Sequence, residues 1–181
     1  MKYIIKPSDI ENINLGKIPN HSKELCQVLN EYTKYLLDVA MNYNESNECG
    51  LLLDIANIEQ YRLFKGTETK VTLNFDFKIL FNYESLESLS NRFVFIHNHP
   101  NNTSFSYQDI KSFIYNDFIY LAIVVQNNGV ANVLMKLSNI FDDTKDFVNK
   151  YDGNIKDLIS VLKLSNLVYY RRFTKNAKHT R

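Results

Sequence analysis

Tryptophan is absent from this chain of 181 residues, and cysteine, proline and glycine are scarce, with two, three and five copies. The cysteines, Cys26 and Cys49, form neither a CxxC pair nor a zinc-finger spacing, which excludes cysteine-based metal sites of those kinds. With so few prolines and glycines, no interdomain linker is evident. The length and the absence of a linker predict one domain with terminal additions.

Long apolar runs and an excess of charge of one sign are also missing. No stretch approaches the ~18–20 apolar residues that span a bilayer, so we expect no membrane partner. The opening sequence MKYIIKPSDI turns polar after a short apolar run, unlike a signal peptide. The formal net charge is only +1, which argues against a general polyanion binder. We therefore expect a cytoplasmic protein with reduced thiols.

The one charge-biased stretch is YYRRFTKNAKHTR, at the end of the sequence, which contains no acidic residue. Such a stretch is typical of a solvated terminus, and it is also suited to contact nucleic acid or an acidic partner. Its basic residues are Arg171, Arg172, Lys175, Lys178 and Arg181.

Hydrophobic periodicity divides the rest of the chain into helices and strands. Helices are expected at 22–43, 75–89, 106–116 and, as two segments broken at 151–153, within 138–174. Strands are expected at 49–56, 58–65, 70–75, 92–97, 118–126 and 130–137. This order predicts an α/β fold, a mixed sheet flanked by helices. The predicted parts are an N-terminal arm (1–21), a main domain (22–137) and a C-terminal helical extension with the basic tail (138–181).

Two of the four histidines fall within three residues, where the apolar run RFVFIH meets a polar loop. Residues i and i+2 of a strand point to the same side, so His97 and His99 can aim at one point. Pro100 then stops the strand. Ser106 and Asp109 follow as neighbours on the first turn of a helix.

Two imidazoles and one carboxylate are a suitable ligand set for zinc. Three protein ligands leave a fourth position for water, which is the arrangement of a catalytic site. Bound zinc would lower the pKa of that water toward ~7. A nearby Glu or Asp would then move the proton, and Ser106 is a candidate donor to the oxyanion. The alternative for Asp109 is a capping box with Ser106, and the alternative for the histidines is an ordinary polar loop.

The sequence His97-Asn98-His99-Pro100 followed by Ser106-x-x-Asp109 resembles the JAMM motif of the JAB/MPN zinc metallopeptidases. The resemblance covers roughly residues 25–137. It implies that His97, His99 and Asp109 bind zinc, that Ser106 supports the oxyanion and that a glutamate on an earlier strand acts as general acid and base. It also implies a sheet architecture related to the cytidine deaminases, although this chain lacks the H-x-E and P-C-x-x-C motifs of a deaminase.

The motif departs from its commonest form at two places. Five residues, rather than six, separate Pro100 from Ser106, a form closer to bacterial and phage-associated JAB domains. The position three before Gly50 is Asn47, so Glu48 is the candidate glutamate, placed by a bulge or a shifted strand start, with Glu45 as the alternative. Because adjacent strand residues face opposite ways, Cys49 is not expected to share a site with Glu48.

The sequence therefore favours a zinc-dependent hydrolase that cleaves a peptide or isopeptide bond, with Glu48 and Ser106 as its catalytic residues. A ubiquitin-like conjugate, a protein processing site and a small modified amino acid all remain open as substrates. One alternative function is a non-catalytic JAB-like scaffold, expected if no carboxylate from residues 45–48 lies near the metal. A further alternative is a nuclease or DNA-associated protein that uses the basic tail.

Overall fold

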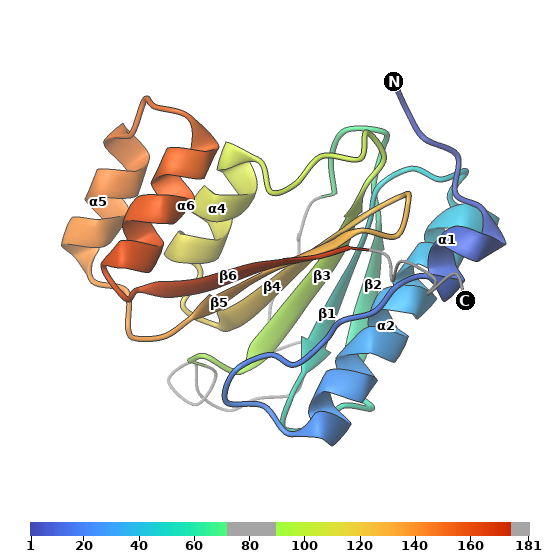
Figure 1. Ribbon diagram of the computed structural model, residues 1–181, viewed down its shortest axis with the longest axis horizontal. Coiled ribbons are helices and arrows are strands. Elements are labelled where there is room, and N and C mark those ends of the chain that lie inside the picture. The colour runs from blue at the N-terminus through green and yellow to red at the C-terminus, as the bar shows by residue number, and fades with distance from the viewer. Residues whose placement is uncertain (72–89, 175–181) are drawn as a thin grey trace, which may run out of the picture.

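The computed structural model describes residues 1–71 and 90–174, which form one six-stranded mixed sheet with helices on both sides (Figure 1). The strands are β1 (Cys49–Asp54), β2 (Tyr61–Lys65), β3 (Phe93–His99), β4 (Ile119–Gln126), β5 (Ala131–Lys136) and β6 (Val168–Phe173). The helices are α1 (Pro7–Glu11), α2 (Lys23–Tyr43), α4 (Tyr107–Tyr115), α5 (Asp142–Lys150) and α6 (Ile155–Leu164). The strand order is β2-β1-β3-β4-β5-β6.

Only β3 and β4 run parallel, while every other neighbouring pair in this sheet is antiparallel. A parallel pair needs a crossover connection, and here α4 provides it. The crossover leaves β3 directly after His99, so the loop and the first turn of α4 lie over the end of that strand. This connection is the feature of the fold that brings Asp109 back toward the histidines.

The sheet separates two apolar clusters. Figure 1 shows α1 and α2 on one side of the sheet and α4, α5 and α6 on the other. The α2 side buries alternate residues such as Cys49, Leu51 and Ile96. The α4 side buries Leu52, Ala122 and their neighbours. Because consecutive strand residues alternate between these two sides, every residue of β3 belongs to one side or the other.

The predicted fold class is confirmed at the level of a mixed sheet flanked by helices. The helix predicted at 22–43 is α2, whose first turn is capped by Ser22 Oγ, which accepts a hydrogen bond from Leu25 N at 3.1 Å. The predicted strand at 92–97 is longer than expected, because β3 continues through both histidines. The strand and helix predicted at 70–75 and 75–89 lie largely or wholly outside the described residues.

The end of the chain differs from the prediction. The two helices expected within 138–174 are present as α5 and α6, but Val168–Phe173 is the strand β6 rather than helix. Its sequence VYYRRF is rich in the aromatic and β-branched residues that favour strands, and pairing with β5 is the tertiary contact that decides it. The expected arm at 1–21 contains the short helix α1 but no strand. Among the described residues, no helix is long and apolar enough to cross a membrane.

Candidate metal centre

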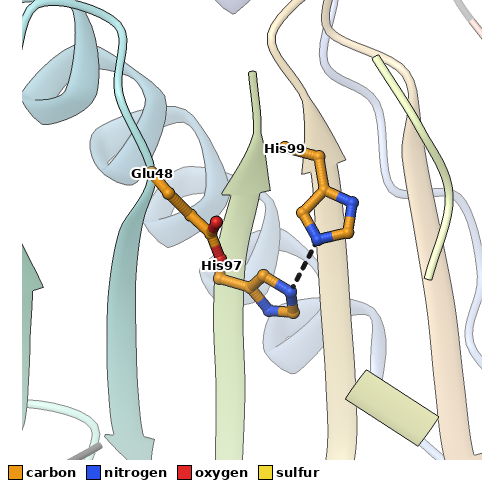
Figure 2. A group of neighbouring side chains, drawn as sticks. All are labelled: Glu48, His97 and His99. Carbon is orange, nitrogen blue, oxygen red and sulfur yellow. Dashed lines mark hydrogen bonds between the residues drawn. The ribbon is translucent and has the colours of Figure 1, made fainter. Parts of the chain in front are cut away.

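His97 and His99 turn their rings toward each other at the end of β3 (Figure 2). Their Nε2 atoms are 3.1 Å apart, and both side chains are nearly buried. Zinc–nitrogen bonds of ~2.0–2.1 Å in a tetrahedral site place two ligand atoms about 3.3 Å apart. The separation of the two ring nitrogens is therefore close to that of two ligands on one metal ion.

The carboxylate of Asp109 faces the same two ring nitrogens. Oδ1 lies 3.2 Å from His97 Nε2, and Oδ2 lies 3.3 Å from His99 Nε2. Asp109 also completes the capping box of α4, because Ser106 N donates to its Oδ2 at 2.6 Å and its own amide donates to Ser106 Oγ at 3.1 Å. The capping function and the approach to the histidines thus occur together, and the first fixes the carboxylate for the second.

Glu48, the residue directly before β1, lies beside the histidines (Figure 2). One ligand atom each of Glu48, His97 and His99 lies within 4.8 Å of the other two. The placement of Glu48 needs no bulge. Gly50 pairs with His97, and Glu48, which lies two residues before Gly50, faces the same side of the sheet. Glu45, the alternative, is exposed, lies outside this cluster and sits in a turn with positive φ.

The cluster perturbs the ionisation of its members. Burial raises the pKa of Glu48 above its ordinary value, and the nearby histidines oppose this only in part. Burial alone would raise the pKa of Asp109 as well, but the two histidines hold it far below its usual range. Burial would lower the pKa of His99, yet its contact with Asp109 raises it. The pKa values of the two carboxylates beside this pair of imidazoles are therefore shifted in opposite directions, upward for Glu48 and downward for Asp109.

Neighbouring groups orient the two rings differently. His99 Nδ1 lies 3.1 Å from Thr103 O and 3.0 Å from Ser104 O. Because carbonyl oxygens only accept, Nδ1 carries a proton, and in the neutral ring Nε2 is therefore the nitrogen whose lone pair faces the cluster. The His97 ring stacks on Phe95 at a centroid distance of 5.0 Å, and its Nδ1 has no partner among the described residues.

Asn98, between the two histidines, points to the opposite side of the sheet and is fully hydrogen-bonded. Its Oδ1 accepts from Cys49 N at 2.7 Å, and its Nδ2 donates to Asn47 O at 3.1 Å and to Asn127 Oδ1 at 2.7 Å. Asn98 therefore holds the two residues that flank Glu48. Sequence reasoning missed this function, because the distant partner Asn127 gives no local signal.

Asn127 extends this support to the N-terminal arm. Its Nδ2 donates to Tyr3 O at 2.8 Å and to Ser46 O at 2.9 Å. Tyr3 N in turn donates to Pro100 O at 2.7 Å, directly after His99. The arm predicted at 1–21 thus packs against both segments that carry the cluster.

The remaining predicted site residues are also located. Ser106 is exposed at the start of α4, where its hydroxyl accepts the capping bond. Cys49 is a buried free thiol on the α2 side, away from the histidines. Arg171 and Arg172 are consecutive residues of β6 and face opposite sides of the sheet, while Lys175, Lys178 and Arg181 lie outside the described residues.

Comparisons with protein-family models, curated proteins and solved structures gave no match to this chain. The site must therefore be interpreted from its own geometry. Glu48, His97 and His99 form a buried group that could hold a metal ion, and Asp109 contacts both histidines. Imidazole nitrogen with carboxylate oxygen is a donor set suited to zinc and other divalent transition metals.

Proposed function

We propose that this protein is a zinc-dependent hydrolase of the JAMM type, which cleaves a peptide or isopeptide bond with metal-activated water. The observation that carries the proposal is the convergence of both Nε2 atoms on the Asp109 carboxylate, with Glu48 beside them. The motif resemblance and the mixed α/β sheet are consistent with it. His97, His99 and Asp109 would hold the metal.

A zinc ion in this site supplies a Lewis acid and a water molecule of lowered pKa. Glu48 accepts a proton from the attacking water and later delivers it to the leaving amine. Burial raises its pKa, which suits a group that must hold a proton for part of the cycle. Asp109, whose pKa is lowered, stays ionised throughout. Ser106 can donate its hydroxyl proton to the developing oxyanion, because Oγ uses only a lone pair in the cap.

The position of Glu48 favours an enzyme over a scaffold. A scaffold was expected to lack a carboxylate from residues 45–48 near the metal, and Glu48 lies within 4.8 Å of the histidines. A nucleic-acid function has less support, because Arg171 and Arg172 diverge to opposite sides of the sheet and form no joint basic surface in the described part of the chain.

The first experiment is to measure zinc per chain in the wild type, in His99→Ala and in His21→Ala. About one zinc per chain is expected in the wild type and in His21→Ala, and none in His99→Ala. His21 is a matched control, since its ring contacts Tyr120, away from the cluster. Anomalous scattering should place the ion between His97, His99 and Asp109. A wild-type protein that stays metal-free in excess zinc would contradict the proposed function.

A further inference from the structure

The loop between β3 and α4 sets the direction of the His99 ring. His99 Nδ1 lies 3.0 Å from Ser104 O, and it lies 3.1 Å from both Thr103 O and Thr103 Oγ1. In the described part of the chain, no hydrogen bond between backbone groups fixes Thr103, Ser104 or Phe105. Side chains must therefore hold this loop in place, and with it the ring whose Nε2 faces the candidate metal centre.

Tyr170 of β6 contacts two consecutive residues of this loop. Its ring packs on the α4 side of the sheet. The hydroxyl oxygen lies 3.3 Å from Ser104 Oγ, and the ring meets the buried Phe105 edge-on, with the two centroids 6.4 Å apart. Tyr170 comes 66 positions after Ser104 in the chain, so a strand of the C-terminal extension holds the loop that follows the histidines.

Asn132 of β5 sets the direction of the hydrogen bond between Ser104 and Tyr170. The Tyr170 hydroxyl donates to Asn132 Oδ1 at 3.1 Å. A phenol has one proton, and this contact uses it, so the Ser104 hydroxyl donates to the Tyr170 oxygen. The two bonds form a chain that runs from Ser104 through Tyr170 to Asn132.

Asn132 is an unusual residue for its place in the sheet. It is fully buried, while every other buried residue of β5 is apolar. Its Nδ2 has no hydrogen-bond partner among the described residues. Burying an amide that is only partly hydrogen-bonded destabilises a fold, so a buried group of this kind needs an explanation. The bond to Tyr170 provides one, because it holds the phenol oxygen where Ser104 can reach it.

We propose that Tyr170 is a positioning residue for the metal ligand His99. Tyr170 holds Ser104, whose backbone carbonyl accepts the Nδ1 hydrogen bond of the ring, and so keeps Nε2 aimed at the metal. The inference rests on the proposed function, which makes His99 a ligand. Removing a group that orients a ligating histidine through its other ring nitrogen lowers metal affinity by ~10–100-fold. Because Tyr170 acts through Ser104, the expected effect lies at the lower end of that range.

Tyr170→Phe tests the inference, because it keeps the ring that packs on Phe105 and removes only the hydroxyl. The dissociation constant for zinc, measured on the folded protein by competition with a chelator, should rise about tenfold. Tyr169→Phe is the matched control. Tyr169 is the neighbouring residue of β6 and packs on the α2 side of the sheet, so loss of its hydroxyl should leave the zinc affinity unchanged.

A double-mutant cycle separates positioning from a general loss of stability. Ser104→Ala should raise the dissociation constant for zinc by about the same factor as Tyr170→Phe, and the two substitutions together should raise it no further than either alone. The visible absorption spectrum of the cobalt-loaded protein reports the geometry of the ligands. It should differ from that of the wild type in these three variants and match it in Tyr169→Phe.

The outcomes separate the inference from the proposed function. A wild type that binds zinc, with the same dissociation constant or the same cobalt spectrum in Tyr170→Phe, contradicts the inference alone. Effects of Ser104→Ala and Tyr170→Phe that multiply in the double variant also contradict it, because Tyr170 would then act by another route. A wild type that stays metal-free in excess zinc contradicts the proposed function, and the inference with it.

Discussion

The end of β3 presents two opposite environments on the two sides of the sheet. On the α4 side, His97 and His99 bring two ring nitrogens to 3.1 Å from each other and face two carboxylates. On the α2 side, Asn98 makes three hydrogen bonds and satisfies its whole amide group. A contact between two ring nitrogens needs a proton or a metal ion between them, whereas the amide network needs nothing further.

The difference shows how one strand end can be both rigid and reactive. Buried polar groups that are fully paired stabilise a single arrangement, while groups left without partners supply binding energy to a ligand. Because side chains alternate along a strand, Asn98 and the two histidines are adjacent in the sequence but face opposite sides of the sheet. We expect substitutions on the α4 side to affect function and substitutions on the α2 side to affect stability.

The largest expected effect comes from Glu48→Gln, which keeps the shape of the side chain but removes the proton acceptor. Zinc content should stay at about one per chain, while turnover falls by about 10³-fold, within the range for a general base. The measurements are metal analysis and steady-state cleavage. Glu45→Gln, at an exposed position outside the cluster, is the control and should retain full turnover. Loss of zinc in Glu48→Gln would instead make Glu48 a ligand.

Asn98→Ala tests the supporting side. It leaves the buried Cys49 amide and Asn127 Oδ1 without partners, so we expect the free energy of unfolding to fall by about 3 kcal/mol. Urea denaturation measures this. Asn42→Ala removes an exposed amide on α2 and should change stability by less than about 0.5 kcal/mol. Equal stabilities of the two variants would contradict a stabilising role for the hydrogen bonds of Asn98.

Ser106→Ala separates capping from catalysis at one residue. Loss of the cap should lower the free energy of unfolding by about 1 kcal/mol. Loss of the oxyanion donor should also lower turnover by about 10²-fold at unchanged zinc content. Ser22→Ala removes the equivalent cap of α2, so it should reproduce the loss of stability without the loss of turnover. If both variants kept full turnover, Ser106 would be a cap only.

The smallest expected effect concerns Lys136, which lies at the other end of the α4 side of the sheet. Its pKa is lowered to about 8, chiefly by burial; Asp117 opposes the shift and Lys145 adds to it. Its Nζ donates to Asn116 O at 2.6 Å. Between pH 8 and 10.5 the unfolded chain holds more protons at this residue than the native protein does. The stability of the wild type relative to Lys136→Met should therefore rise through that window. A difference independent of pH would show that Lys136 titrates as an ordinary exposed lysine.

Local rules predicted the parts of this molecule that depend on neighbouring residues. Alternation along a strand placed His97 and His99 on one side, and the S-x-x-D spacing placed Asp109 on the first turn of α4. Glu48 was selected only through the motif resemblance, since its distance from the histidines depends on which strand pairs with β3. The composition of VYYRRF favours a strand, but its place beside β5 depends on a contact far away in the chain. The Asn98–Asn127 bond also joins distant residues, and no local pattern predicts it.

The hydrogen bonds of Tyr3 also set an order of assembly. Tyr3 O accepts from Asn127 Nδ2 across a separation of 124 residues, and Tyr3 N donates to Pro100 O. During synthesis the first residues leave the ribosome long before residue 127 exists, whereas α2 can form once residue 43 has emerged. Closing so long a loop also costs more entropy than closing a local turn. The support under the candidate metal centre can therefore be completed only after residue 127 has been synthesised.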